Sequence, residues 1–194
     1  MFYRTARGKW WIRAERAHLP LNCYPTFRSS GSFGKRQEYI AVAELLRRGF
    51  DVYMTLVDDQ QIDCVLRIEV DGHPVYIDLQ IKARSKNARQ PGTFAAVEVR
   101  DPRPNFMFVF YSEAADTYWL MPSLDVVRQA TENKGGETGQ GANKGKLTIV
   151  FTSTRADGTV SPRPRFDAWR NNWEALTAMA AQVALPGAER LRPP

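Results

Sequence analysis

The chain has 194 residues, of which 43% are hydrophobic and 25% charged, and its formal net charge at pH 7 is +6. This composition indicates one domain with a substantial core and makes a polyanion the first partner to consider. Two cysteines and two histidines argue against a disulfide framework and a His/Cys metal site, and they favour a reducing, cytoplasmic compartment. No apolar run approaches the roughly 20 residues of a membrane span, so no membrane association is expected.

Residues 1–31 are predicted to be a basic extension. Residues 1–36 carry eight basic side chains against the single acid Glu15, with aromatic residues interleaved. One interpretation is an arm that lies along phosphates and stacks its rings on exposed bases. The other is a solvated extension whose aromatic residues cap the core. The sequence leaves both open.

Residues 35–48 are predicted to form an amphipathic helix, because apolar side chains recur at helical spacing and Gly49 follows the last turn. Three stretches rich in β-forming residues come next, at 50–57, 62–70 and 75–83. A polar turn follows the first stretch, and the hairpin signal Asp71-Gly72 follows the second. The pattern predicts a helix followed by a three-stranded meander.

The rest of the chain mixes strands and helices. Strands are predicted at 94–99, 106–111, 117–121 and 147–152, and helices at 124–131 and 167–183. The second of these strands is apolar throughout, which indicates a central strand buried on both faces. Residues 133–146 are glycine-rich and predict a flexible loop, and 186–194 predict a tail. The fold class expected for residues 32–185 is α/β, with a mixed β-sheet flanked by helices.

The third strand of the meander carries a polar row. Side chains alternate along a strand, so Asp78, Gln80 and Lys82 share one face. Such alternation is ordinary for a half-buried strand with a solvent-facing side. Two further acids could converge with this row: Asp63 opens the preceding strand, and Glu38 lies in the first turn of the predicted helix.

These residues resemble the active-site pattern of the PD-(D/E)XK nuclease superfamily, the restriction-endonuclease-like fold. In that family an αβββαβ core joins a helix Glu, an Asp at the start of the second strand and an acid-x-Lys pair on the third. The matching positions are Glu38, Asp63 and Gln80-Ile81-Lys82. Gln80 replaces the usual acid and is similar to the Gln-x-Lys variant of some branches. The resemblance covers roughly residues 32–122, and archaeal-type Holliday junction resolvases and restriction or repair endonucleases look closest.

The resemblance implies a metal-dependent endonuclease that hydrolyses phosphodiester bonds in DNA, with Mg²⁺ or Mn²⁺ as the cofactor. It implies that Asp63, Gln80 and the backbone carbonyl of Ile81 hold the metal, and that Glu38 binds a second metal ion or holds a metal-bound water. Lys82 would orient the attacking water and stabilise developing charge. Oxygen ligands are the ones that Mg²⁺ prefers, and a hard cation neutralises the oxygens of a phosphodiester.

Basic side chains near these positions are predicted to contact phosphates: Lys35, Arg36, Arg84 and Lys86. A homodimer would place two such sites on opposite DNA strands. Two other functions stay open. One is a catalytically inactive nucleic-acid-binding domain on the same fold, and the other is a protein-interaction or toxin-immunity-type module whose charge aids solubility.

Three neighbouring residues have their own expectations. Asp78 is a further metal-ligand candidate, because Gln80 brings no charge; its alternative is a solvent-exposed acid or an ion pair with Lys or Arg. Cys64 is predicted to be a buried, unreactive thiol on the core face. His73 is predicted to lie in the turn formed by residues 71–74.

Overall fold

The computed structural model describes residues 2–4, 10–12, 30–56, 60–134 and 141–185. Residues 1–32 and 33–194 form two compact units. In the first unit, strands β1 (Phe2–Arg4) and β2 (Trp10–Ile12) pair in antiparallel fashion. Most of the basic extension and the tail at 186–194 lie outside the described residues, so both interpretations of the extension stay predictions.

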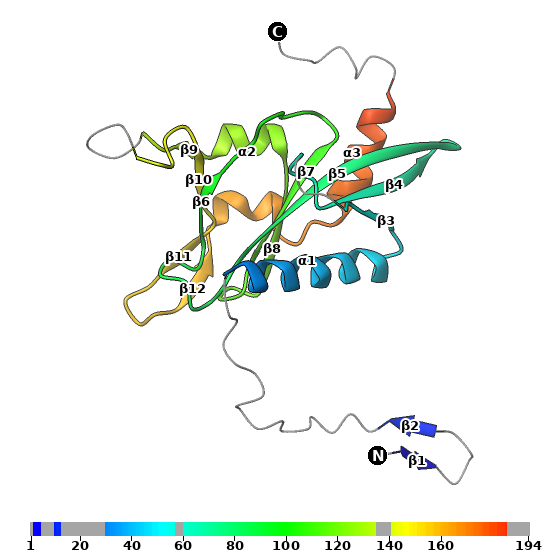
Figure 1. The fold of residues 1–194 in the computed structure, drawn as a ribbon, viewed down its shortest axis with the longest axis horizontal. Helices are drawn as coiled ribbons and strands as arrows, with labels where there is room; N and C mark the ends of the chain where they lie inside the picture. The colour runs from blue at the N-terminus through cyan, green and yellow to red at the C-terminus, as the bar shows by residue number, and fades with distance from the viewer. Residues whose placement is uncertain (1, 5–9, 13–29, 57–59, 135–140, 186–194) are drawn as a thin grey trace. The chain divides into compact units, whose positions relative to one another are not determined.

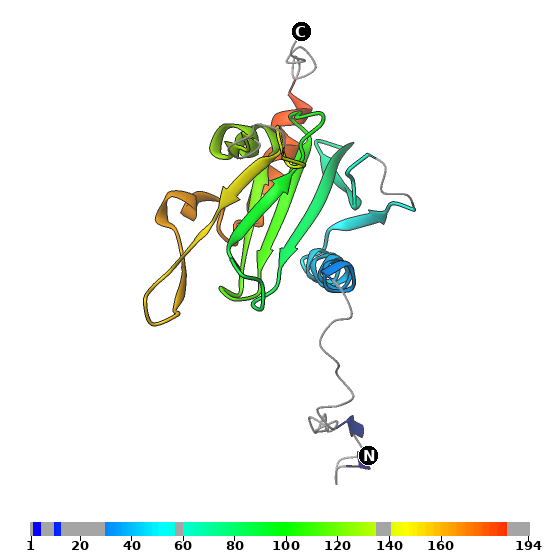
Figure 2. The same ribbon diagram turned by 60° about the vertical axis from the view of Figure 1, so that its left-hand side comes forward.

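A five-stranded mixed sheet forms the centre of the second unit (Figures 1 and 2). Its strands lie side by side in the order β3 (Asp51–Met54), β4 (Cys64–Val70), β5 (His73–Arg84), β7 (Phe106–Ser112) and β8 (Thr117–Pro122). Strands β5 and β7 are parallel, and the other neighbours are antiparallel. The predicted meander is confirmed as β3–β4–β5, which places the polar row of β5 in the middle of the sheet.

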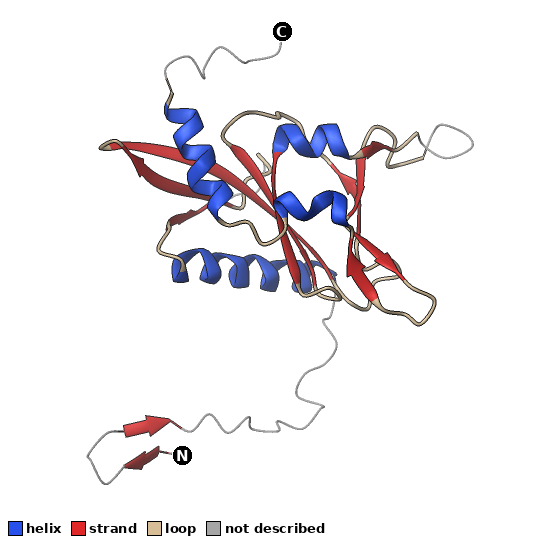
Figure 3. Cartoon of the chain, turned by 180° about the vertical axis from the view of Figure 1, so that it is seen from behind, coloured by secondary structure: helices blue, strands red, loops and turns tan. Residues whose placement is uncertain are grey.

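One face of the sheet is covered by α1 (Ser30–Arg47) and α3 (Glu174–Ala184), which Figure 3 shows from behind. Apolar side chains of both helices share a core cluster with the inward residues of β4 and β5. Cys64, Leu79 and Ile81 belong to that cluster and are buried. The side chains alternating with them on β5, which include Gln80 and Lys82, therefore point to the opposite face.

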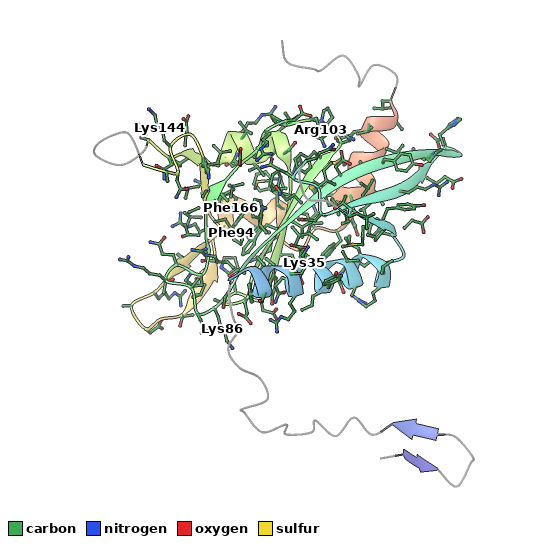
Figure 4. The ribbon with its side chains drawn as sticks, viewed as in Figure 1. Lys35, Lys86, Phe94, Arg103, Lys144 and Phe166 are labelled. Carbon is green, nitrogen blue, oxygen red and sulfur yellow. The ribbon has the colours of Figure 1, made fainter. Side chains whose placement is uncertain are left out.

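The opposite face carries an aromatic core. Phe106, Phe108 and Phe110 of β7 pack there against Phe94 of β6 (Thr93–Val97) and Phe166 of η2 (Pro164–Trp169), and Figure 4 labels the last two. The Phe110 ring centroid lies 5.0 Å from that of Phe94. Both faces of β7 are thus covered, as its apolar sequence predicts.

The remaining elements surround this aromatic core. Helix α2 (Ser123–Gln129) follows β8, and β6, β10 (Leu147–Val150) and β9 (Thr131–Glu132) form a three-stranded sheet. Strands β11 (Thr152–Thr154) and β12 (Val160–Pro162) form a separate two-stranded hairpin. No helix in the described part of the chain is long and apolar enough to cross a bilayer.

Two predicted elements are wrong in detail. The single helix expected at 167–183 is instead η2 followed by α3, because Asn171 has a positive φ of 50° and exchanges hydrogen bonds with the Tyr118 backbone. The strand expected at 147–152 breaks at Phe151, which separates β10 from β11. His73 is not in the turn but is the first residue of β5, paired with Val70.

The order of elements also departs from the αβββαβ core at one point. Parallel neighbours such as β5 and β7 need a crossover, which is usually a helix. Residues 85–105 are described throughout and contain no helix; the crossover passes through β6 instead. The first helix after the meander is α2, which follows β8.

Candidate active site at the start of strand β4

Asp63 lies one residue before β4 and is 6% exposed. Its N–H donates to the Leu79 carbonyl at 2.8 Å, which continues the pairing of β4 with β5. Its carboxylate Oδ2 then accepts a hydrogen bond from the Ile81 N–H at 2.6 Å. The side chain thus takes the place of a backbone carbonyl at the end of the ladder, and this bond holds the buried carboxylate in one orientation.

Gln80 lies opposite Asp63, because the antiparallel register pairs Cys64 with Leu79 one step earlier. It is 2% exposed, and its Oε1 has no hydrogen-bond partner in the described part of the chain. A buried acceptor without a donor costs roughly 1–3 kcal/mol, so most native structures avoid one. Trp119 Nε1 is also buried without a hydrogen-bond partner among the described residues, but it lies in the aromatic core. An indole N–H is a donor only, so it cannot bind a cation.

The backbone of Ile81 faces the same place. In an antiparallel ladder the N–H and C=O of one residue point to the same neighbour. Because the Ile81 N–H is directed to Asp63, the Ile81 carbonyl is directed to the same side. The register pairs β4 with β5 only as far as Leu79, so this carbonyl lies beyond the end of that pairing. An amide oxygen, a carboxylate and a carbonyl oxygen therefore gather at the start of β4.

Glu38 reaches the same region from α1. Its side chain is 16% exposed and forms an ion pair with Lys35. Hydrogen bonding to Glu38 raises the pKa of Lys35, and the negative charge of Asp63 adds to this rise. Burial raises the pKa of the Cys64 thiol to about 12, with Asp63 and Glu38 contributing as well. The two acids thus act on the same neighbours, and Cys64 is a buried, protonated thiol as predicted.

Lys82 lies two residues beyond Gln80 on the same face of β5 and is partly exposed. It forms no ion pair with any residue that the structure describes. The pKa of Glu98 is lowered mainly by a hydrogen bond from Arg100, and the charges of Lys146 and Lys82 lower it further. In the described part of the chain Lys82 forms no hydrogen bond or ion pair with Asp63 or Glu38, so strand register alone places it on the face of Gln80.

Asp78, at the other end of the polar row, has a partner of its own. Its Oδ2 accepts a hydrogen bond from Arg103 Nη2 at 2.7 Å, and both side chains are partly buried. The Arg103 guanidinium also lies 4.7 Å from the centroid of the Phe106 ring. The ion-pair alternative is therefore confirmed for Asp78.

The predicted phosphate-contacting residues fall into two groups. Arg36 lies 3.6 Å from Glu113, and the Lys86 N–H donates to the same carboxylate at 3.1 Å. Arg84 donates a long hydrogen bond of 3.4 Å to the Gln90 carbonyl. Lys35, by contrast, pairs with Glu38 and so lies beside a carboxylate of the candidate site. Figure 4 labels Lys35 and Lys86, which mark the start of α1 and the loop after β5.

Sequence reasoning missed Glu113 and the position of Lys35. Glu113 follows β7, and its N–H donates to the Arg84 carbonyl. The parallel register of β5 and β7 therefore brings Glu113 to the loop after β5, which carries Lys86. No local pattern marks such a residue. For Lys35, the signal is the three-residue spacing from Glu38, which places both on one face of a helix.

The donors at this site suit a hard divalent cation. Among the described residues no group of three His, Cys, Asp or Glu side chains is placed to hold a metal. Carboxylate, amide and carbonyl oxygens are nevertheless the donor types that Mg²⁺ and Mn²⁺ prefer. The buried oxygen of Gln80, which has no hydrogen-bond partner among the residues that the structure describes, lies opposite the buried Asp63 carboxylate, and this pair fits such an ion.

Comparison with known proteins agrees with this fold. No family model matches the chain, and no curated protein matches it. Among solved structures, the chain is similar to a bacterial homing endonuclease, I-Ssp6803I, with a TM-score of 0.51 and 20% sequence identity. The similarity covers 79% of this chain and 96% of the other. The mixed sheet flanked by helices confirms the expected fold class, and this similarity agrees with it.

Proposed function

We propose that this protein is an endonuclease that hydrolyses phosphodiester bonds in DNA with Mg²⁺ or Mn²⁺. The observation that carries the proposal is the buried pair at the start of β4. Asp63 is oriented by the Ile81 N–H, and Gln80 directly opposite presents an oxygen without a hydrogen-bond partner in the described part of the chain. The likeness to a protein described as a homing endonuclease supports the same conclusion.

Each residue then has a distinct task. Asp63, Gln80 and the Ile81 carbonyl would hold the cation, and Glu38, which pairs with Lys35 in this structure, would add a second carboxylate. Bound there, a divalent cation would supply charge neutralisation for phosphate oxygens and would make a water molecule more acidic. The hydrogen bond from Ile81 keeps the Asp63 carboxylate from rotating. Lys82 brings a positive charge to the face of Gln80, where it orients water and stabilises charge that develops on the phosphate.

The DNA backbone is held by basic residues around this site. Arg36 and Lys86 flank Glu113, and Arg84 ends β5 two residues beyond Lys82. Phosphate contacts of this kind fix the position of a duplex without reading its sequence. The net charge of +6 favours association with DNA and makes the affinity fall as the salt concentration rises.

Nicking of supercoiled plasmid in Mg²⁺ or Mn²⁺ tests this proposal. We expect the wild-type chain to cut and Asp63→Asn to lose more than 100-fold of the rate, on the order of a lost charge-stabilising group, while DNA binding is kept. The amide still accepts a hydrogen bond from Ile81, so the fold is preserved, which thermal unfolding checks. Asp78→Asn is the matched control and should cut normally. Equal cutting by Asp63→Asn and wild type would overturn the assignment.

A second candidate function is a catalytically inactive DNA-binding domain. Gln80 favours it, because an amide brings no negative charge to a cation and weakens its binding. This alternative predicts salt-dependent DNA binding with no cleavage in any divalent cation. A protein-interaction module predicts instead no affinity for DNA even at low salt.

A further inference from the structure

The hairpin β11–β12 is a polar ribbon outside the central sheet (Figures 1 and 2). The residues from Ser153 to Thr159 are all exposed. Ser153 pairs with Ser161, and strand alternation places Arg155 and Thr159 on the same face. This face therefore presents three hydroxyl groups and one guanidinium, and Arg155 forms no ion pair with any described residue.

The tip of the hairpin is ordered by its own hydrogen bonds. The Arg155 N–H donates to the Thr159 carbonyl at 2.9 Å, and the Gly158 N–H donates to the Arg155 carbonyl at 3.0 Å. Gly158 has a φ of 85°, as the bulge position of a three-residue hairpin loop requires. The Thr159 N–H also binds Asp157 at 2.8 Å and lowers the pKa of that carboxyl. The ribbon is thus formed before any partner binds, which reduces the entropy cost of binding.

The base of the hairpin is packed against the basic loop that follows β5. The Phe151 N–H donates to the Gly92 carbonyl at 3.0 Å. A Cβ on Gly92 would lie only 1.5 Å from Thr152 Oγ1, so the Thr152 side chain packs directly on the Gly92 backbone and leaves no room for a side chain there. The loop from Ser85 to Gly92, which carries Lys86, therefore joins the candidate active site to the hairpin. A ligand held by this loop lies next to the ribbon.

We infer that the hairpin β11–β12 reads base edges in the major groove of duplex DNA beside the site of cleavage. This inference rests on the proposed function, because it assigns DNA as the substrate. A two-stranded ribbon fits the major groove of B-form DNA, which is about 12 Å wide. Arg makes paired hydrogen bonds to guanine, and Ser or Thr bind several bases. The loop holds phosphates, and the ribbon supplies sequence preference.

A binding selection from random-sequence duplexes tests the ribbon. The full chain carrying Asp63→Asn serves as the reference, because it binds without cutting. We expect it to enrich a defined motif. Adding Arg155→Ala should lower discrimination at one or two positions of the motif by about tenfold, which is within the range for one paired base contact. Ser153→Ala should have a smaller effect. Arg128→Ala on α2 is the matched control for loss of an exposed arginine and should keep the motif.

A charge-preserving change separates base reading from phosphate binding. Arg155→Lys keeps the charge but loses the planar fork, so it should lose the same base preference as Arg155→Ala. Full recovery of the motif by Arg155→Lys would overturn base reading by Arg155. Equal affinity for an A-form RNA duplex would overturn the ribbon as well, because side chains do not enter that deep and narrow major groove.

The two proposals fail in different ways. A selected motif without plasmid cutting would reject the endonuclease and keep the ribbon. Plasmid cutting by the wild-type chain without a selected motif would reject the ribbon and keep the endonuclease. If both hold, cuts by the wild-type chain should fall at a fixed distance from the motif, because Gly92 and Thr152 tie the loop to the hairpin.

Discussion

The two ends of the polar row on β5 differ in how their charges are satisfied. At one end, Asp78 is paired with Arg103, and that guanidinium lies against the Phe106 ring. At the other end, Gln80 Oε1 has no partner and Lys82 has no ion pair among the described residues. The same alternation on one strand thus carries a structural pair and a candidate site. Unsatisfied buried groups, and not polarity itself, distinguish the site.

The largest expected effect compares Lys82, at one end of the row, with Arg103, which pairs with Asp78 at the other end. Lys82→Ala should lower the rate of plasmid nicking by about 100- to 1,000-fold, because it removes a charge that stabilises the reacting phosphate. Arg103→Ala should leave the nicking rate within a few-fold of the wild type. Nicking is measured at saturating DNA and Mg²⁺. A comparable loss in both variants would show that the two ends do not differ in function.

The second effect concerns stability and has opposite signs at the two ends. Gln80→Leu should raise the free energy of unfolding by about 1 kcal/mol or more, because it removes a buried acceptor without a donor. Arg103→Ala should lower it by about 2 kcal/mol, since Asp78 loses its charged hydrogen bond. Urea unfolding measures both. Gln80→Leu should also lose nicking activity, so a more stable but inactive chain is the expected signature of a ligand position.

The third effect is on the cation requirement. Gln80→Glu places a second carboxylate opposite Asp63, and it should lower the Mg²⁺ concentration for half-maximal nicking by about tenfold, through added negative charge. Asp78→Glu is the matched control at the end of the row that pairs with Arg103, and it should leave this concentration unchanged. An unchanged Mg²⁺ requirement in Gln80→Glu would place the cation away from Gln80.

The smallest effect concerns Cys64, which lies beside Asp63 but faces the core. The unfolded chain loses the thiol proton above the ordinary pKa of 9.0, whereas the folded chain keeps it up to about 12. The free energy of unfolding should therefore fall as the pH rises from 9, by about 1 kcal/mol at pH 10. Urea unfolding of the wild type and Cys64→Ala measures this difference. Parallel pH profiles for the two chains would show that the thiol is not buried.

Much of the central sheet follows from local sequence pattern. The apolar stretch from Phe106 predicts a strand buried on both faces, and Asp71-Gly72 predicts the tight turn between β4 and β5; both residues of that turn have positive φ. Alternation on β5 correctly places Gln80 and Lys82 on one face. These features depend on residues only a few positions apart, which a sequence displays directly.

The partners of the polar groups were decided by tertiary structure. Alternation gives Asp78 and Gln80 the same description, and only the crossover between β5 and β7 brings Arg103 to the first. Likewise, the carboxylate of Asp63 reaches the Ile81 N–H because the β4 ladder ends at that point. The period of a strand is set by its own backbone, whereas the partner of a side chain depends on how distant segments are aligned. The sequence by itself therefore determined which residues are candidates, and the packing of the sheet determined which of them are satisfied.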